Sequence, residues 1–213
     1  MTVVPRHQCL IYHGSPARYL ASLANVIKAQ LASNSRCLFM NSPAMVAGMR
    51  SYLAAAGLDV AQEVQSGALV LSSDQSHLKN GQFESDRMID LLTEAIEGAL
   101  RDGYASLWAT GDMTWEFGNE NNFGKLMEYE CALEELFRRY PPLCGICQYH
   151  ADTLPADAIP VGLNSHGAMF INETLTWMNP YYSRAGSRVK KQPPVNTAQL
   201  REILDRLSQP KVS

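Results

Sequence analysis

The chain has 213 residues, which is enough for one domain with a single large core. Its hydrophobic content of 46% and charged content of 18% describe an ordinary soluble globular protein. The net charge of −3 offers no electrostatic footprint for direct nucleic-acid binding, and no apolar run approaches the roughly 20 residues that would span a bilayer.

Short apolar runs alternate with segments of helical periodicity along the chain. In chain order, we expect a strand at 9–12, a helix at 16–33, a strand at 36–41, a helix at 43–56, strands at 60–64 and 68–72, a helix at 84–101, a strand at 104–110, a helix at 123–140, a strand at 143–149, a helix at 155–163, and a strand hairpin at 168–171 and 174–177.

Strands that alternate with helices predict an α/β fold with three layers, in which a mainly parallel central sheet is flanked by helices. The nearly all-apolar run at 143–149 is typical of a strand buried on both faces. We expect one domain over residues 1–185. Residues 186–213 are expected to form a linker and a short amphipathic helix, which is too short to be stable alone and must dock on this domain or on another chain.

The cysteine pattern indicates a reducing environment. The chain has five cysteines, an odd number, and no signal peptide, so we expect a cytoplasmic protein. Cys144 and Cys147 have the spacing of a redox or zinc pair. No second pair of cysteines and no paired histidines complete a metal site, and residues three apart on a strand point to opposite faces. We therefore expect two buried cysteines that act as small hydrophobes, and no metal.

The loop after the first strand argues against nucleotide hydrolysis. A phosphate-binding loop needs the pattern G-x-x-x-x-G-K-[ST], in which backbone N–H groups and a lysine hold the phosphates. The segment from His13 to Arg18 has one glycine, no lysine and a proline at position 16. We therefore expect no ATP hydrolysis and no cofactor. Residual nucleotide binding stays open, because a helix N-terminus alone can hold a phosphate group.

Polar and aromatic residues gather where two predicted strands end. Asp112 and Trp115 follow one strand, and Gln148 and Tyr149 end another. The carboxyl ends of parallel strands are where α/β proteins usually place a ligand. Asp112 at such a position could hold a metal, accept a proton or simply cap a helix.

Other polar residues have simpler interpretations. If it has no role in a ligand site, His7 is a surface residue near the terminus. In the same way, His166 is a histidine at a helix-to-strand turn. His77 and His150 are expected to be solvated. Of Glu128 and Glu130, one carboxylate is expected to face the sheet and the other to be solvated.

Several motifs in a fixed order resemble one family. They are His7-x-Cys9-x-x-Tyr12, Gly111-Asp112-Met113-Thr114-Trp115, Leu126-x-x-Tyr129-Glu130, Cys147-Gln148-Tyr149, His166 and Asn179-Pro180-x-Tyr182. This order resembles the MEDS domain, the methanogen/methylotroph DcmR-type sensory domain, over roughly residues 5–184. The family often has Glu where this chain has Asp112 and Pro where it has Gly167.

The resemblance implies a RecA/KaiC-like fold with a degenerate phosphate loop. It also implies a sensory role in signal transduction and transcription regulation, with a small organic ligand such as a hydrocarbon derivative. We expect the chain to bind this ligand at the carboxyl ends of the strands and to signal through a partner protein such as a kinase or transcription regulator. A homodimer is also compatible with the sequence.

The ligand site is expected to include His7, Tyr12, Asp112, Met113, Trp115, Gln148, Tyr149, His166, Asn179 and Tyr182. No catalytic residue is assigned, and the chain is not expected to be an enzyme. Two alternatives remain open. One is an enzyme that uses Asp112 and His166 as an acid–base pair, and the other is a non-catalytic scaffold for protein–protein interaction.

Overall fold

A computed structural model describes residues 6–116, 125–178 and 182. The strands are β1 (His7–Tyr12), β2 (Ser35–Met40), β3 (Leu69–Ser72), β4 (Leu78–Lys79), β5 (Gln82–Phe83), β6 (Ser106–Asp112), β7 (Leu143–His150), β8 (Ala168–Asn172) and β9 (Leu175–Met178). The helices are η1 (Pro16–Tyr19), α1 (Leu20–Ala32), α2 (Pro43–Ala55), α3 (Val60–Gln65), α4 (Ser85–Arg101), α5 (Met113–Glu116), α6 (Leu126–Arg139) and α7 (Ala158–Ser165).

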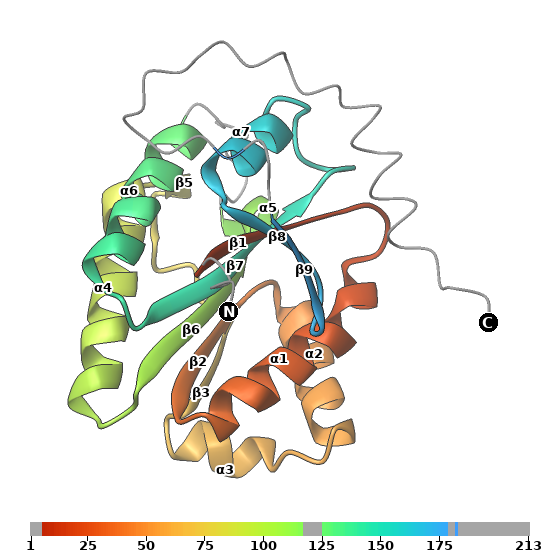
Figure 1. The fold of residues 1–213 in the computed structure, drawn as a ribbon, viewed down its shortest axis with the longest axis vertical. Helices are drawn as coiled ribbons and strands as arrows, with labels where there is room; N and C mark the ends of the chain where they lie inside the picture. Colours follow the sequence, from red (N-terminus) through yellow and green to blue (C-terminus); the bar gives the residue numbers. More distant parts are fainter. Residues whose placement is uncertain (1–5, 117–124, 179–181, 183–213) are drawn as a thin grey trace.

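A seven-stranded sheet in the order β3-β2-β6-β7-β1-β8-β9 forms the middle layer (Figure 1). Each neighbouring pair is parallel except β8 and β9, which form an antiparallel hairpin. The predicted α/β fold with a mainly parallel sheet between helices is therefore confirmed. β4 and β5 form a separate small hairpin that the sequence pattern did not predict.

Each face of the sheet carries its own apolar core. On one face, α4 and α6 pack on β6 and β7 through residues such as Leu92, Leu133 and Leu107. On the other face, α1 and α2 pack on β2 and β6 through residues such as Ile27 and Phe39. Figure 1 shows α4 and α6 on the left and α1 and α2 at the lower right. The burial of both faces explains why the central strands are continuous apolar runs.

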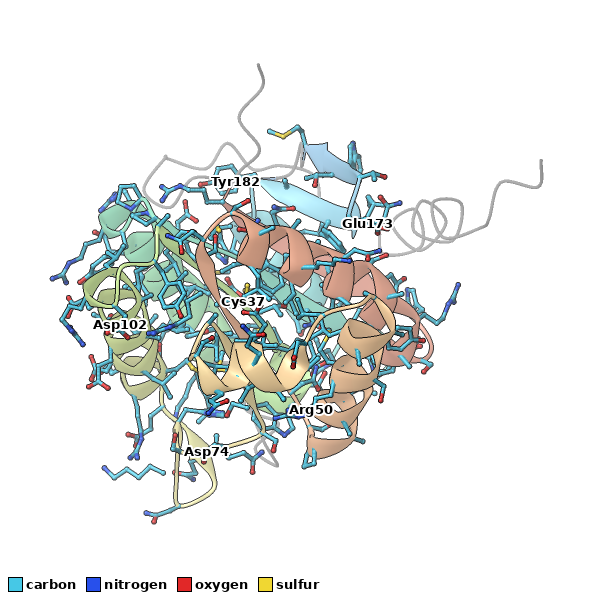
Figure 2. The ribbon with its side chains drawn as sticks, turned by 90° about the horizontal axis from the view of Figure 1, so that it is seen from below. Cys37, Arg50, Asp74, Asp102, Glu173 and Tyr182 are labelled. Atoms are coloured by element: carbon cyan, nitrogen blue, oxygen red, sulfur yellow. The ribbon has the colours of Figure 1, made fainter. Side chains whose placement is uncertain are left out.

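Local signals set the helix ends. Pro43 occupies the first turn of α2, where its missing N–H costs nothing. Gly57, with φ of 80°, follows that helix in the left-handed conformation that glycine adopts without strain. Figure 2 labels Cys37 of β2, which is fully buried, and Arg50 of α2, which is exposed.

The strand predicted at residues 60–64 is wrong, because this segment is helix α3. The side chain of Asp59 accepts a hydrogen bond from the backbone N–H of Gln62 at 3.0 Å and so caps the helix. Capping of this kind favours a helix where an apolar pattern of only five residues is ambiguous.

Three hydrophobic residues of the helices are exposed rather than buried in the core. Leu100 of α4 is 39% exposed and Met127 of α6 is 46% exposed, and Cys131 of α6 is also exposed. On α6, Met127 and Cys131 are four residues apart and share the outer face. The inner face carries Tyr129, Glu130 and Leu133, so a glutamate occupies a position that the apolar pattern alone would not predict.

None of the helices in the described segments combines the length and the apolar character that crossing a bilayer requires. The predicted tail over residues 186–213, with its amphipathic helix, lies outside the described residues.

Candidate functional site

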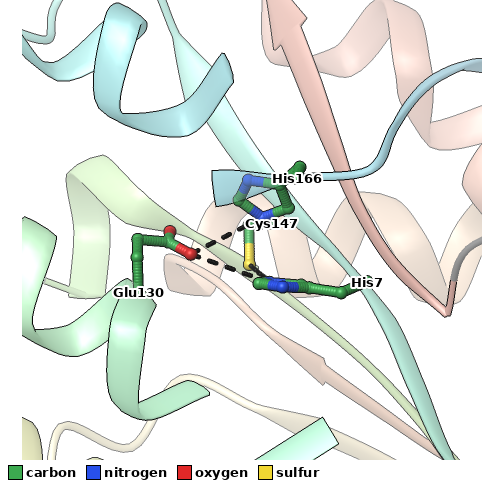
Figure 3. Close-up of side chains that lie close together, drawn as sticks. All are labelled: His7, Glu130, Cys147 and His166. Carbon is green, nitrogen blue, oxygen red and sulfur yellow. Dashed lines mark hydrogen bonds and ion pairs between the residues drawn. The ribbon is translucent and has the colours of Figure 1, made fainter. Parts of the chain in front are cut away.

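A buried cluster of His7, Glu130, Cys147 and His166 forms on the sheet face that α6 covers (Figure 3). Strand pairing brings together the parts that are distant in sequence, because β1 runs parallel to β7 with Cys9 opposite Cys147. His7 starts β1, Cys147 lies within β7, Glu130 comes from α6, and His166 directly follows α7. All four side chains are 6% exposed or less.

Three distances within this cluster are similar to one another. His7 Nε2 lies 3.7 Å from Glu130 Oε2 and 3.5 Å from Cys147 Sγ. His166 Nε2 lies 3.6 Å from the same Glu130 oxygen. The two imidazole rings are tilted against each other with centroids 4.0 Å apart. Glu130 Oε2 is therefore the point on which both histidines converge.

A surrounding set of contacts fixes the orientation of the cluster. His7 Nδ1 lies 3.0 Å from Glu134 Oε2, and His166 Nδ1 lies 2.6 Å from the carbonyl oxygen of Gly162. Because these oxygens only accept hydrogen bonds, each ring carries its proton on Nδ1 and presents the Nε2 lone pair inward. The hydroxyl of Tyr149 donates to Glu130 Oε1. The other carboxylate oxygen of Glu130 is left facing the two rings.

Burial disfavours the charged forms of Glu130, Cys147 and His166. It raises the pKa of the Glu130 carboxyl, an effect that the neighbouring His7 partly offsets. Burial, followed by repulsion from Glu130 and Glu116, raises the pKa of the Cys147 thiol well above its ordinary value. Burial, followed by the neighbouring His7, holds the pKa of His166 well below its ordinary value. Cys147 is therefore a thiol rather than a ready nucleophile.

A second polar group lies at the carboxyl ends of β1, β6 and β7. The Tyr12 hydroxyl donates to Asp112 Oδ2 at 3.0 Å, and the Trp115 backbone N–H donates to Asp112 Oδ1 at 2.9 Å. Burial raises the pKa of Asp112, while these two hydrogen bonds oppose the increase. Gln148 Nε2 donates to Thr110 Oγ1 at 2.8 Å. Asp112 therefore caps the turn that follows β6. A cap is one of the three roles that the sequence predicts for it.

An apolar cavity of about 30 Å³ lies between the sheet and helices α4 and α6. Its lining includes Leu92, Ala109, Met113, Glu116, Leu133, Phe137 and Cys147. Small residues on the strands create this hollow, since Ala109 and Gly111 on β6 face the helices with little or no side chain. The cavity adjoins the cluster directly, because Cys147 contacts His7 and the Phe137 ring stacks on His7 with centroids 4.4 Å apart.

The wall of the cavity includes a buried carboxylic acid. Glu116 is 1% exposed, and its Oε2 has no hydrogen-bond partner among the described residues. A Cβ on Gly111 would lie 1.5 Å from Glu116 Oε1, so only glycine leaves room for this carboxyl. Burial, with repulsion from Asp112 and Glu130, raises the pKa of Glu116 well above its ordinary value.

We expect the difference in the free energy of unfolding between Glu116→Gln and the wild type to shift in favour of the variant as the pH rises from 4 to 8. Above the ordinary carboxyl pKa of about 4.3 the unfolded state ionises while the folded state stays protonated, so the wild type loses about 1.4 kcal/mol per pH unit until the folded carboxyl ionises. The variant lacks this loss. Urea unfolding across the pH range measures the difference. The exposed control Glu94→Gln should show no such trend, and a pH-independent difference for Glu116→Gln would contradict the prediction.

The structure distributes the predicted ligand-site residues over several places. His7 and His166 belong to the buried cluster, and Tyr149 donates to its Glu130. Tyr182 donates at 2.9 Å to Glu134 Oε1, whose other carboxylate oxygen contacts His7. Tyr12, Asp112 and Gln148 lie at the strand ends, and Met113 lines the cavity. Trp115 is partly buried beside His77, with ring centroids 5.6 Å apart. Asn179 lies outside the described residues.

Two histidine interpretations are wrong. His77 is 1% exposed, and its Nε2 lies 2.9 Å from the carbonyl oxygen of Glu116, so it is not solvated. His7 is 4% exposed and is not a surface residue. His150 is half-buried, and its Nε2 bonds the carbonyl oxygen of Gly14 at 2.7 Å.

Sequence reasoning did not connect Cys147, Glu130, Glu134 and Glu116 with a site. Two signals could have found part of this set. Glu130 and Glu134 are four residues apart and share one helix face. Cys147 and Tyr149 alternate on a strand in the same way as His7 and Cys9 do, which places each pair on one face. The strand pairing that unites these faces is not visible in the sequence.

Comparison with known proteins gives one family. The model of the family described as MEDS, the methanogen/methylotroph DcmR sensory domain, matches residues 6–167. No curated protein matches the chain.

Proposed function

Because the chain belongs to the MEDS family of sensory domains, we propose that it binds a small organic molecule and reports this binding to a partner protein in the cytoplasm. The observation that carries the proposal is the apolar cavity beneath α4 and α6, which adjoins the buried polar cluster. The cavity lies between the sheet and the side of α6 that faces it, next to the carboxyl end of β6.

The size and lining of the cavity suggest the class of ligand. A water molecule needs about 10–15 Å³ measured in this way, so a cavity of about 30 Å³ holds a molecule of only a few heavy atoms. Leucine, methionine and phenylalanine side chains supply an apolar wall, while the Glu116 carboxyl and the Cys147 thiol supply polar contacts. A short hydrocarbon derivative with one polar substituent fits this chemistry.

Helix α6 supplies a route for the signal. Its Leu133 and Phe137 line the cavity. Its Glu134 accepts a hydrogen bond from His7, and its Glu130 lies beside both histidines of the cluster. A ligand that displaces α6 would therefore alter both the cluster and the outer face of the helix. We propose that a kinase or a transcription regulator recognises this change.

A relation of the fold to RecA/KaiC-like proteins stays a prediction.

Asp112 and His166 belong to different groups of residues, each with its own partners. This placement supports binding rather than acid–base catalysis by the pair. Asp112 accepts hydrogen bonds from Tyr12 and Trp115 at the strand ends. His166 donates to Gly162 and lies beside Glu130 under α6 and α7. A cavity in the core also favours sensing over a pure scaffold, whose interior would be filled by its own side chains.

We expect a compound that fits the cavity to raise the Tm of the wild type and to lose most of this effect in Ala109→Val. The side chain of Ala109 faces the cavity, so two added methyl groups occupy the space of the ligand. The measurement is thermal shift followed by calorimetric titration with short haloalkanes, alcohols, amines and carboxylic acids, and binding to the variant should be at least about tenfold weaker.

Ala54→Val on the exposed surface of α2 is the matched control and should bind as the wild type does. Failure of all these compounds to bind the wild type would refute the proposed ligand class. Equal binding by Ala109→Val would move the site away from this cavity.

A further inference from the structure

The buried cluster has a donor set suited to a metal ion. Two imidazole nitrogens, one thiol sulfur and one carboxylate oxygen, from His7, His166, Cys147 and Glu130, all lie within 4.8 Å of one another. Nitrogen, sulfur and carboxylate ligands in a set of four are typical of zinc sites in proteins. The four donors come from β1, α6, β7 and the residue after α7, so they converge from separate elements on one point.

We propose that His7 Nε2, Glu130 Oε2, Cys147 Sγ and His166 Nε2 bind a transition-metal ion, with zinc as the best fit. This site shares Cys147 with the lining of the cavity for the organic ligand, but the metal proposal does not depend on the proposed sensory function.

Three of the six separations between the donor atoms are close to those of a tetrahedral site. Bonds of about 2.0–2.2 Å to nitrogen and oxygen and about 2.3 Å to sulfur place the corners of a tetrahedron roughly 3.3–3.6 Å apart. The three measured edges are 3.5, 3.6 and 3.7 Å. The two histidine–glutamate separations are too long for hydrogen bonds, so the atoms are held apart at the spacing that an ion between them requires.

The surrounding contacts are those that metal ligands usually have. A metal-bound histidine commonly donates its second N–H to a carboxylate or a backbone carbonyl. Here His7 donates to Glu134 Oε2 at 3.0 Å, and His166 donates to the Gly162 carbonyl oxygen at 2.6 Å. The hydroxyl of Tyr149 donates a hydrogen bond to Glu130 Oε1. The opposite oxygen, Oε2, is fully buried and makes no hydrogen bond of normal geometry within the described part of the chain.

The burial of all four donors indicates a closed, four-coordinate site. Sites of this kind stabilise a fold, whereas catalytic zinc sites keep one position open. A bound ion would fasten α6 and the end of α7 to strands β1 and β7. It would thereby hold the wall of the cavity that α6 supplies.

The test uses the full chain, prepared without chelators for elemental analysis and then stripped of metal and titrated with Co²⁺. We expect about one ion per chain, and the cobalt form should show the sulfur-to-cobalt charge-transfer absorption and the intense visible bands of a tetrahedral site. Cys147→Ser should lose the charge-transfer absorption. Glu134→Gln, which alters the outer contact of His7 and the acceptor of Tyr182 but none of the four donors, should weaken binding about 10- to 100-fold.

Cys131→Ser removes an exposed thiol on the same α6 helix and is the matched control, which should keep the full cobalt spectrum. A wild type that gives no such spectrum overturns the proposal, and this readout needs no variant to fold. A charge-transfer absorption that survives in Cys147→Ser, or disappears in Cys131→Ser, overturns it as well. In those cases the cluster is a metal-free network of hydrogen bonds.

Discussion

Glu130→Ala is expected to lower the free energy of unfolding by about 1–3 kcal/mol, the usual cost of leaving a buried hydrogen-bonding group without its partner. Glu130 is fully buried, accepts the hydrogen bond of Tyr149 and lies against both histidines of the cluster. Its removal leaves the Tyr149 hydroxyl without this acceptor in the core. Urea unfolding of chelator-treated protein at neutral pH measures the effect on the network without any contribution from metal.

Two further variants make the Glu130 experiment specific. Glu128→Ala alters an exposed glutamate on the same helix and should change stability by no more than about 0.5 kcal/mol. Glu130→Gln keeps an oxygen that can accept from Tyr149 and should cost clearly less than the alanine variant. If Glu130→Ala and Glu128→Ala were equally mild, the buried network would not stabilise the fold.

Gly145→Ala is expected to destabilise the protein by about 3 kcal/mol, the upper part of the range for overpacked cores. A Cβ at this position would lie 2.2 Å from the backbone oxygen of Ala109, its register partner on β6. A backbone atom cannot rotate away as a side chain can, so β6 and β7 would have to separate at the centre of the sheet. Thermal and urea unfolding of the variant measure the cost.

Gly98→Ala provides the opposite expectation on the same fold. Gly98 lies inside helix α4, and a Cβ there would meet only side-chain atoms of Arg36 and Arg101 at 3.6 and 3.7 Å. Alanine should therefore stabilise the protein by about 0.5–1 kcal/mol, because glycine loses more conformational freedom on folding. A Gly145→Ala variant as stable as the wild type would show that the two strands can move apart at little cost.

The strength of the sequence pattern decided which elements could be predicted. The run at Leu143–His150 is apolar almost throughout, and it forms a central strand as expected. The segment at residues 60–64 is too short to distinguish a strand from a helix, and the Asp59 cap decided it in favour of a helix. The family resemblance and the strand-end position of Asp112 could also be read from the sequence.

The buried cluster shows what the sequence could not supply. Its members lie at positions 7, 130, 147 and 166, and no spacing between them repeats. The sequence predicts that Cys147 acts as a small hydrophobe, which agrees with its burial but does not account for its contact with His7. The sequence does not reveal the cavity either, because the cavity arises from small residues on β6 opposite α4 and α6 and corresponds to no motif.

The sequence by itself determined the alternation of strands and helices, the burial of the central strands, and the family to which the chain belongs. These properties follow from periodicity and composition, which act over a few neighbouring residues. The tertiary structure alone decided that β1 lies beside β7, that Glu130 rather than Glu128 points inward, and that His7 meets His166 across the sheet face. Such contacts depend on strand order, register and helix rotation, which are fixed only when the whole core packs at once.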